Sequence, residues 1–273
     1  MRFFSAILLA LISAFAFAPP ANAKVVRDVI YADAPGLDPG DVRADVYIPD
    51  DADNAPVILM MHGGAWTFGN KLSALGMFQA RYFNDQGFVF IAVNYRLSPA
   101  HPFPAQQQDT AAAIAYFHEH ATEFGGDPNS IFLMGHSAGA HMAALTAIDP
   151  DYLDAFDLTP GVIKGVVAMD SAAYNMARTG SDGDSPEFYH STFTSDDPDV
   201  WTAASPTLLV EETTDIPPFL LLYVNRAVAP SRAKELAEVL NSAGHKAEAR
   251  LVKNRDHKSL NDRLGAKGDK VAP

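Results

Sequence analysis

The chain has 273 residues, no cysteine, and 33 acidic against 20 basic residues, which gives a formal charge of −13. This excess of acid argues against nucleic-acid and anionic-membrane partners. The absence of cysteine excludes disulfide bridges, a thiolate nucleophile and thiolate metal ligands.

The first segment is typical of a secretory signal peptide. A positive start is followed by an apolar run over residues 3–18 and by small residues up to Ala23. The run is short for a membrane span, so we expect cleavage after Ala23, export, and no stable membrane anchor afterwards. Residues 1–23 are thus predicted to be a signal peptide, and residues 24–273 one large α/β domain of a secreted or periplasmic protein.

Short apolar runs then alternate with helical segments. Residues 42–48 alternate apolar and polar side chains, as in a half-buried antiparallel strand. Strands buried on both faces are expected at 56–64, 88–95, 130–135, 161–170 and 219–224, with an edge strand at 246–252. Helices are expected at 72–86, 105–125, 138–148 and 230–244. This alternation predicts an α/β fold with a mostly parallel sheet and helices on both faces.

Residues 171–215 interrupt this rhythm. The stretch is rich in Ser, Thr, Asp and Pro and carries the aromatic residues Phe188, Tyr189, Phe193 and Trp201. An insertion of this length inside a compact domain is usually functional, so we predict a lid. The alternative is a packed surface excursion without a role.

The sequence GHSAG at 135–139 lies between a buried strand and a helix of small residues. A sharp turn there would expose the Ser137 hydroxyl at the carboxyl end of the strand, and Gly135 and Gly139 lack side chains that would collide in the turn. The helix that follows points its positive end toward the reacting oxygen. We therefore predict that Ser137 is a nucleophile, the alternative being a serine that only caps the helix.

The sequence HGGAW at 62–66 follows an earlier strand. Acyl transfer creates an oxyanion, which needs backbone N–H donors held in place in a dry site. Gly63, Gly64 or Ala65 can supply one donor and the Ala138 amide another, and Gly63, Gly64 and Ala138 are the predicted set. The alternative is an ordinary glycine turn.

Several motifs together resemble the α/β-hydrolase carboxylesterases, closest to the hormone-sensitive-lipase-like and arylformamidase-like enzymes. The motifs are HGGAW, NYRLSP (94–99), HPFPAQQQD (101–109), FGGDPNSIFLMGHSAGAHMAAL (124–145) and DHKSLNDRLG (256–265). The resemblance spans nearly all of the chain after the signal. It implies the α/β-hydrolase fold, a small-molecule ester as substrate, and a serine triad in the order nucleophile, acid, histidine.

Nine histidines compete for the role of base. The resemblance assigns it to a loop after the last strand, where His257 alone lies. A neutral imidazole there can take the Ser137 proton and return it to the leaving alcohol. His118 and His120 are spaced i, i+2 on a predicted helix, which does not bring them together on a metal. We predict no metal and no organic cofactor.

The acid is the open question. The family pattern places an aspartate in the turn after residues 219–224, but that turn offers Asn225 and Arg226 instead. Asp170 is preferred, because it ends the neighbouring strand about 5 Å away at the same sheet edge; its alternative role is to cap the next turn. Asn225 could also orient the imidazole without charge. Further candidates are Asp256, Glu211, Glu212 and Asp215.

The predicted protein is an exported serine carboxylesterase that forms an acyl-enzyme on Ser137. One rival is an amidase or arylformamidase using the same site. The other is a non-catalytic binding protein, which the missing acid favours and the intact Ser137 opposes. Ala65, where many relatives have a third glycine, favours ordinary over tertiary-alcohol esters. The sequence carries no signal for an oligomeric state.

Overall fold

The computed structural model describes the chain from residue 24 to residue 271, except for 34–36, 39, 179–188, 190–192, 194, 196 and 212–213. The predicted signal peptide therefore lies outside the described residues, as does much of the predicted lid at 171–215. Within the described ranges, no helix has the length and apolar character needed to cross a bilayer.

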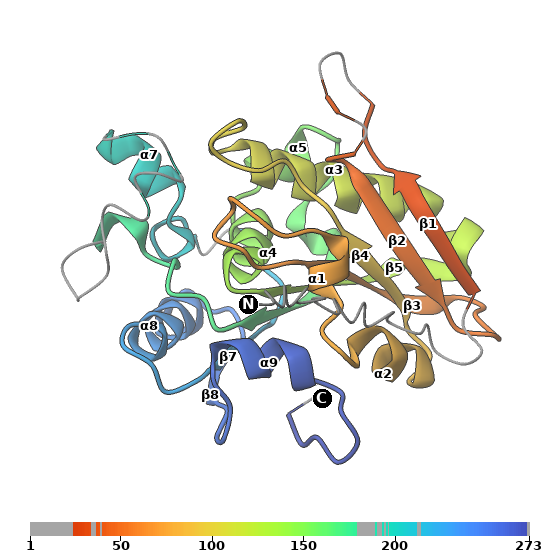
Figure 1. Cartoon of the computed structure of the whole chain (residues 1–273). Coiled ribbons are helices and arrows are strands. Elements are labelled where there is room, and N and C mark those ends of the chain that lie inside the picture. Colours follow the sequence, from red (N-terminus) through yellow and green to blue (C-terminus); the bar gives the residue numbers. More distant parts are fainter. Residues whose placement is uncertain are drawn as a thin grey trace, which may run out of the picture.

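An eight-stranded sheet forms the centre of the molecule (Figure 1). The strands are β1 (Lys24–Ile30), β2 (Arg43–Ile48), β3 (Ala55–Met61), β4 (Val89–Val93), β5 (Gly126–His136), β6 (Ile163–Met169), β7 (Phe219–Tyr223) and β8 (Ala247–Leu251). Their order is β1-β2-β4-β3-β5-β6-β7-β8, and only the β1–β2 and β2–β4 pairs are antiparallel. The predicted mostly parallel sheet is confirmed.

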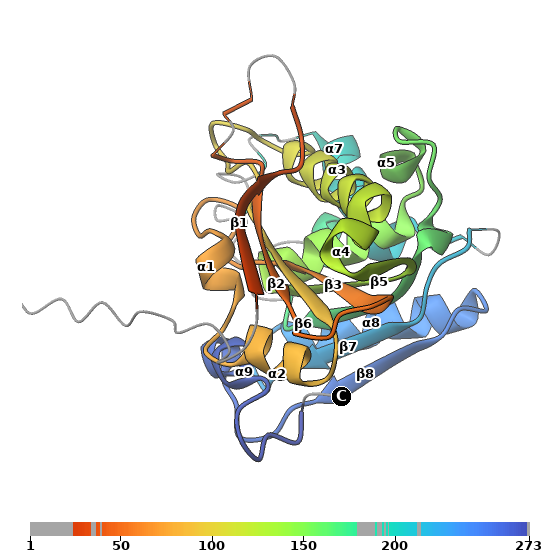
Figure 2. The ribbon, with the colours of Figure 1, turned by 90° about the vertical axis from the view of Figure 1, so that its right-hand side faces the viewer.

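Helices cover both faces of this sheet (Figure 2). The α-helices are α1 (Lys71–Ala74), α2 (Gln79–Asp85), α3 (Ala105–His120), α4 (Ala138–Ile148), α5 (Asp151–Asp154), α7 (Pro198–Ala203), α8 (Ala229–Ser242) and α9 (His257–Arg263). Short 3₁₀ helices are η1 (Ala121–Phe124), η2 (Pro160–Val162), η3 (Met176–Arg178) and η4 (Pro206–Leu208). Apolar residues of α3, α4 and α8 pack in one core, and those of α1, α2 and α9 in a second core across the sheet.

The helix expected at 72–86 is in fact two helices, α1 and α2, so that prediction is wrong. The chain breaks at Gly76, whose φ is +49°. A Cβ at this position would lie 2.5 Å from the carbonyl oxygen of Asn261. Glycine is therefore required at the break, where α9, which lies far away in the sequence, approaches closely.

The strand expected at 42–48 forms as β2, but it is not half-buried as predicted. All five of its residues after Arg43 are buried, including Asp45, which is 1% exposed. Asp45 forms ion pairs with Lys71 of α1 and Arg27 of β1. A buried charge is tolerated when it is paired in this way. The polar residues in the alternating pattern therefore do not mark a face of the strand that is open to solvent.

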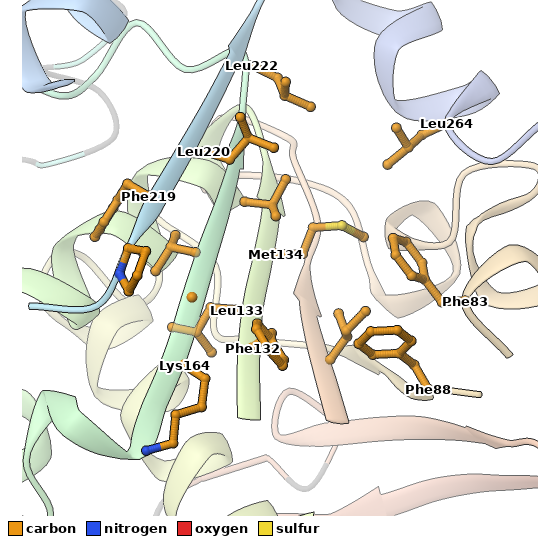
Figure 3. A pocket seen from close by; sticks show the side chains of 15 residues that line it. Phe83, Phe88, Phe132, Leu133, Met134, Lys164, Phe219, Leu220, Leu222 and Leu264 are labelled. Atoms are coloured by element: carbon orange, nitrogen blue, oxygen red, sulfur yellow. The ribbon is translucent and has the colours of Figure 1, made fainter. Parts of the chain in front are cut away.

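A groove of 390 Å³ lies on the sheet face that α2 and α9 cover (Figure 3). Its floor is formed by side chains of β5, β6 and β7, and Phe83, Phe88 and Leu264 lie together along one side of it. Phe88, Phe132 and Leu220 are only half-buried there. The short helices α2 and α9 therefore leave part of this apolar face uncovered.

Candidate active site

Two predicted site residues, and Arg226, follow strands that end at one edge of the sheet. Ser137 comes after β5, Asp170 after β6 and Arg226 after β7. β5 and β6 are in register up to their last residues, and the N–H of Ser137 donates to the carbonyl oxygen of Met169 at 2.8 Å. Likewise the N–H of Asp170 donates to the carbonyl oxygen of Leu222 at 2.7 Å. Three neighbouring strand ends thus hold these residues side by side.

Ser137 occupies a sharply turned backbone, with φ +56° and ψ −116°. This left-handed region is unfavourable for a residue with a side chain and is found mostly where the surrounding structure enforces it. A Cβ on Gly135 would lie 2.2 Å from the oxygen of Gly139, and one on Gly139 would lie 2.2 Å from the oxygen of Met61. Both glycines are therefore required for the strand to turn directly into α4.

Asp170 accepts a hydrogen bond from the imidazole of His257. His257 Nδ1–H donates to Asp170 Oδ2 at 2.6 Å, and the N–H of Val224 donates to Oδ1 at 3.0 Å. The Asp170 side chain is fully buried, whereas that of His257 is 39% exposed. The carboxylate is therefore fixed on two sides while the imidazole still reaches the pocket.

The structure places His257 at the first position of α9 rather than in the predicted loop. Asp256 is the N-cap of this helix, and its carboxylate accepts from the N–H of Ser259 at 2.7 Å. Asp256 is thereby turned away from the imidazole beside it. The capping pattern D-x-x-S was present in the sequence and could have located this helix start.

The other acid candidates that the structure describes are not brought to the imidazole. Asn225 is exposed, and among the described residues its side chain forms no hydrogen bond. The carbonyl of Glu211 accepts from His245 instead, at 2.8 Å. Asp215 lies against Gly161, before β6, at the opposite end of that strand from Asp170. Glu212 lies outside the described residues.

Arg226 also binds Asp170. Its Nε donates to Asp170 Oδ2 at 2.7 Å and its Nη2 to the backbone oxygen of Asp170 at 2.8 Å. Burial acts to raise the pKa of Asp170, but the hydrogen bonds from His257 and Val224 and the positive Arg226 outweigh it and lower that pKa. The carboxylate therefore stays ionised, as a group that stabilises an imidazolium must.

His136 helps to hold His257 in position through its backbone. Its Nε2–H donates to the carbonyl oxygen of His257 at 2.8 Å, and the two rings lie 4.4 Å apart. Burial lowers the pKa of His136 to about 4. A neutral imidazole therefore holds the start of α9 against the end of β5.

The glycine loop after β3 approaches the nucleophile turn closely. A Cβ on Gly63 would lie 3.2 Å from that of Ser137, and one on Gly64, with φ +126°, would lie 1.8 Å from the oxygen of Phe68. The N–H of Ala138 has no acceptor four residues back, because α4 begins there. The glycine loop and the first turn of α4 therefore both lie next to the Ser137 side chain.

The pocket at this edge has a volume of 180 Å³. Its lining residues are Ala65, Trp66, Ser137, Ala138, Ser171, Ala172, Ala173, Tyr189, Arg226 and His257. Ser137 and His257 face one cavity, although no hydrogen bond joins their side chains in the described part of the chain; such contacts often tighten only when substrate binds. Ala65 and Trp66 line the pocket, whereas Gly63 and Gly64, which precede them in the chain, are not among its lining residues.

Aromatic residues of the predicted lid pack over this pocket. The aromatic cluster consists of Trp66, Tyr189, Phe193 and Trp201. Phe193 lies 5.1 Å from Trp66 and 5.7 Å from Trp201, and Tyr189 lies 6.3 Å from Trp66, all between ring centroids. All four side chains are buried. The described parts of residues 171–215 are therefore packed against the site.

The sequence did not reveal that Arg226 lines the pocket or that Trp66 and Tyr189 shape it. Arg226 was visible only as a residue in the turn where an acid was expected. The signal that could have found it is the pairing of a missing acid with an adjacent cation, since a displaced carboxylate then has a nearby partner.

We expect the protein to lose stability steeply between pH 7 and pH 5. Burial lowers the pKa of His62, His136 and His141 to about 4, from an ordinary 6.5. Above pH 6.5 these groups are neutral whether the chain is folded or not; as pH falls toward 4, only the unfolded chain takes up protons. Each of the three histidines therefore lowers the free energy of unfolding by about 2 kcal/mol at pH 5.

The measurement is the urea midpoint at pH 7 and pH 5, followed by far-UV circular dichroism. Asp109 and Asp149 have raised pKa values because they are buried, and they therefore stabilise the folded chain as the pH falls. Because this opposes the effect of the histidines, variants of single histidines give a clearer comparison. His141→Gln should reduce the loss by about 2 kcal/mol. The surface variant His245→Gln should leave it unchanged, and an equal loss in both variants would contradict the explanation.

Comparison with known proteins shows that the chain is similar to esterases. The family model BD-FAE matches residues 44–240. Isoprenylcysteine alpha-carbonyl methylesterase ICME of Arabidopsis thaliana is 27% identical over 254 residues, covering 87% of this chain and 58% of that protein. Esterase LipQ of Mycobacterium tuberculosis is 31% identical over 205 residues, covering 70% of this chain and 47% of that protein. The chain thus spans about half the length of these curated relatives.

Solved structures share the fold. A truncated carbohydrate esterase from gut microbiota superposes with a TM-score of 0.73 at 23% identity, covering 88% of this chain and 91% of that one. Esterase B of Lactobacillus rhamnosis gives a TM-score of 0.69 at 21% identity, with 86% of this chain and 76% of that chain covered. At these identities the match establishes the architecture, which is that of the α/β hydrolases.

Proposed function

The chain belongs to the BD-FAE family and has the α/β-hydrolase fold, and from this we propose that it is an exported serine carboxylesterase. The observation that carries the proposal is the hydrogen bond of 2.6 Å between His257 and a buried, ionised Asp170, beside the strained turn of Ser137. The names of the relatives, which are all esterases, support ester hydrolysis.

In the proposed reaction, Ser137 Oγ attacks the carbonyl carbon of an ester while His257 Nε2 takes the hydroxyl proton. The oxyanion then accepts hydrogen bonds from the Ala138 N–H and from an amide of the loop that contains Gly63 and Gly64. Collapse of the intermediate breaks the bond to the alcohol, which leaves with the proton from His257. Water, activated by the same imidazole, then cleaves the acyl-enzyme and releases the acid.

Asp170 has two tasks in this scheme. Its hydrogen bond fixes the tautomer in which His257 Nδ1 carries the proton and Nε2 is free to act as base. Its charge stabilises the imidazolium that forms in each half-reaction. The burial of Asp170 and its three donors, His257, Val224 and Arg226, support this assignment.

The test begins with the full-length precursor expressed in a bacterium and recovered from the periplasm. N-terminal sequencing should start at Lys24, and the protein should hydrolyse p-nitrophenyl butyrate. A fluorophosphonate should stop the reaction and add its mass to the peptide that contains Ser137. Failure to hydrolyse any short or medium-chain ester would oppose the enzyme proposal and favour a binding protein on this fold.

A further inference from the structure

Arg226 stands in the turn where the resemblance predicted the acid, and only half of its guanidinium is used there. The edge formed by Nε and Nη2 binds Asp170, with distances of 2.7 Å to Oδ2 and 2.8 Å to the backbone oxygen. Among the residues that the structure describes, Nη1 has no hydrogen-bond partner. The second edge of the guanidinium, formed by Nη1 and Nη2, therefore keeps its outward donors.

This second edge belongs to a side chain that faces the substrate pocket. Arg226 lines the 180 Å³ cavity together with Ser137 and His257, and its side chain is 34% exposed. An arginine that served only to hold Asp170 would not need to reach the cavity. The side chain is therefore partly open to solvent, and the described residues provide no hydrogen-bond partner for Nη1.

The described part of the remaining wall offers no competing anion. Apart from Arg226 and His257, the described lining residues carry no charge. They are four alanines, two serines, Trp66 and Tyr189. The Asp170 carboxylate is fully buried behind the pocket and already accepts three hydrogen bonds. An anion that enters the cavity would thus meet donors of Arg226 and no exposed carboxylate of the described lining residues.

We propose that Arg226 recognises a carboxylate on the substrate, so that the site prefers esters that also carry a carboxylate group. The planar fork of a guanidinium matches a carboxylate with two parallel hydrogen bonds, a geometry that a neutral group uses less well. The inference rests on the proposed ester hydrolysis and adds the class of substrate. Because Asp170 already balances the charge of Arg226 and the pocket is open to solvent, we expect a preference of about tenfold in kcat/KM.

The test compares matched substrates in which one carboxylate is replaced by a neutral group of similar size. The acyl side is probed with the mono-p-nitrophenyl ester of adipic acid against the same compound with its free carboxylate methylated. The alcohol side is probed with 4-carboxyphenyl butyrate against 4-carbamoylphenyl butyrate. Each ratio of kcat/KM is measured for the wild type, Arg226→Gln, Arg226→Lys and the surface control Arg250→Gln.

For one of the two pairs, the wild type and Arg250→Gln should prefer the charged member about tenfold, mostly through KM, and salt should weaken the preference. Arg226→Gln should lower kcat for both members, because Asp170 loses a donor, but its ratio should fall to about one. Arg226→Lys should retain part of the ratio, since it keeps the charge and loses the fork. The ratio isolates recognition from any general loss of activity.

Ratios near one in the wild type, or a ratio that survives in Arg226→Gln, would overturn the inference while leaving the proposed function standing. If the wild type hydrolysed none of the four esters, the proposed function itself would fail. Calorimetric titration with adipate then tests whether Arg226 binds a carboxylate, independently of hydrolysis. Binding that is lost in Arg226→Gln and kept in Arg250→Gln supports the inference. Absence of adipate binding to the wild type in that case overturns it.

Discussion

Ser137→Ala should lower kcat for p-nitrophenyl butyrate by about 10⁴- to 10⁶-fold, because the acyl-enzyme cannot form and the other catalytic groups act as a unit with the nucleophile. The fold should remain, since alanine fills the same space and the Ser137 hydroxyl forms no hydrogen bond among the described residues. The strained backbone, with φ +56°, is kept by the surrounding glycines. Initial rates and a thermal melt by circular dichroism measure both quantities.

The matched control is Ser242→Ala, which changes an exposed serine at the end of α8. Its rate and melting temperature should equal those of the wild type. If Ser137→Ala retained more than about one hundredth of the wild-type kcat, another nucleophile or a water attack would be responsible, and the acyl-enzyme proposal would fall.

Asp170→Asn should lower kcat by about 10²- to 10⁴-fold, the second-largest effect expected. An amide carries no charge to stabilise the His257 imidazolium, and its NH₂ group would face donors, either Arg226 or the N–H of Val224. The same change removes the only described counter-charge of Arg226, so the unfolding free energy should fall by about 1–3 kcal/mol. Steady-state kinetics and urea unfolding measure the two effects.

Asn225→Ala is the control for the rival assignment, because Asn225 occupies the turn where the family pattern has its acid. It is exposed, so we expect its kcat to stay within about twofold of the wild type. The opposite result, a wild-type rate in Asp170→Asn and a large loss in Asn225→Ala, would show that Asn225 orients the imidazole and that the acid has not moved to β6.

The architecture could be predicted because its signals are local. The helix expected at 138–148 matches α4 residue for residue, and each continuous apolar run became a strand of the sheet. The failures come from contacts across the fold. α1 and α2 separate at Gly76, where the Asn261 backbone is close, and β1, whose residues are mostly exposed or half-buried, lacks an apolar pattern to reveal it.

The site was only partly predictable for the same reason. Ser137 carries its evidence in adjacent residues, because glycines on both sides and the small residues of α4 are what the turn requires. Choosing between Asp170 and Asn225 needs the register of β6 against β7 and the direction of each side chain, and neither is encoded within a few residues. Arg226 illustrates the limit: its identity was plain, but its two contacts with Asp170 depend on three-dimensional proximity.

The aromatic cluster decides what the fluorescence of this protein reports. The chain has two tryptophans, Trp66 and Trp201, and both belong to the cluster beside the pocket. Emission excited at the indole band therefore comes from one small region rather than from the domain as a whole. It serves as a label-free signal for occupancy of the pocket, while global unfolding has to be followed by a probe that senses the entire sheet.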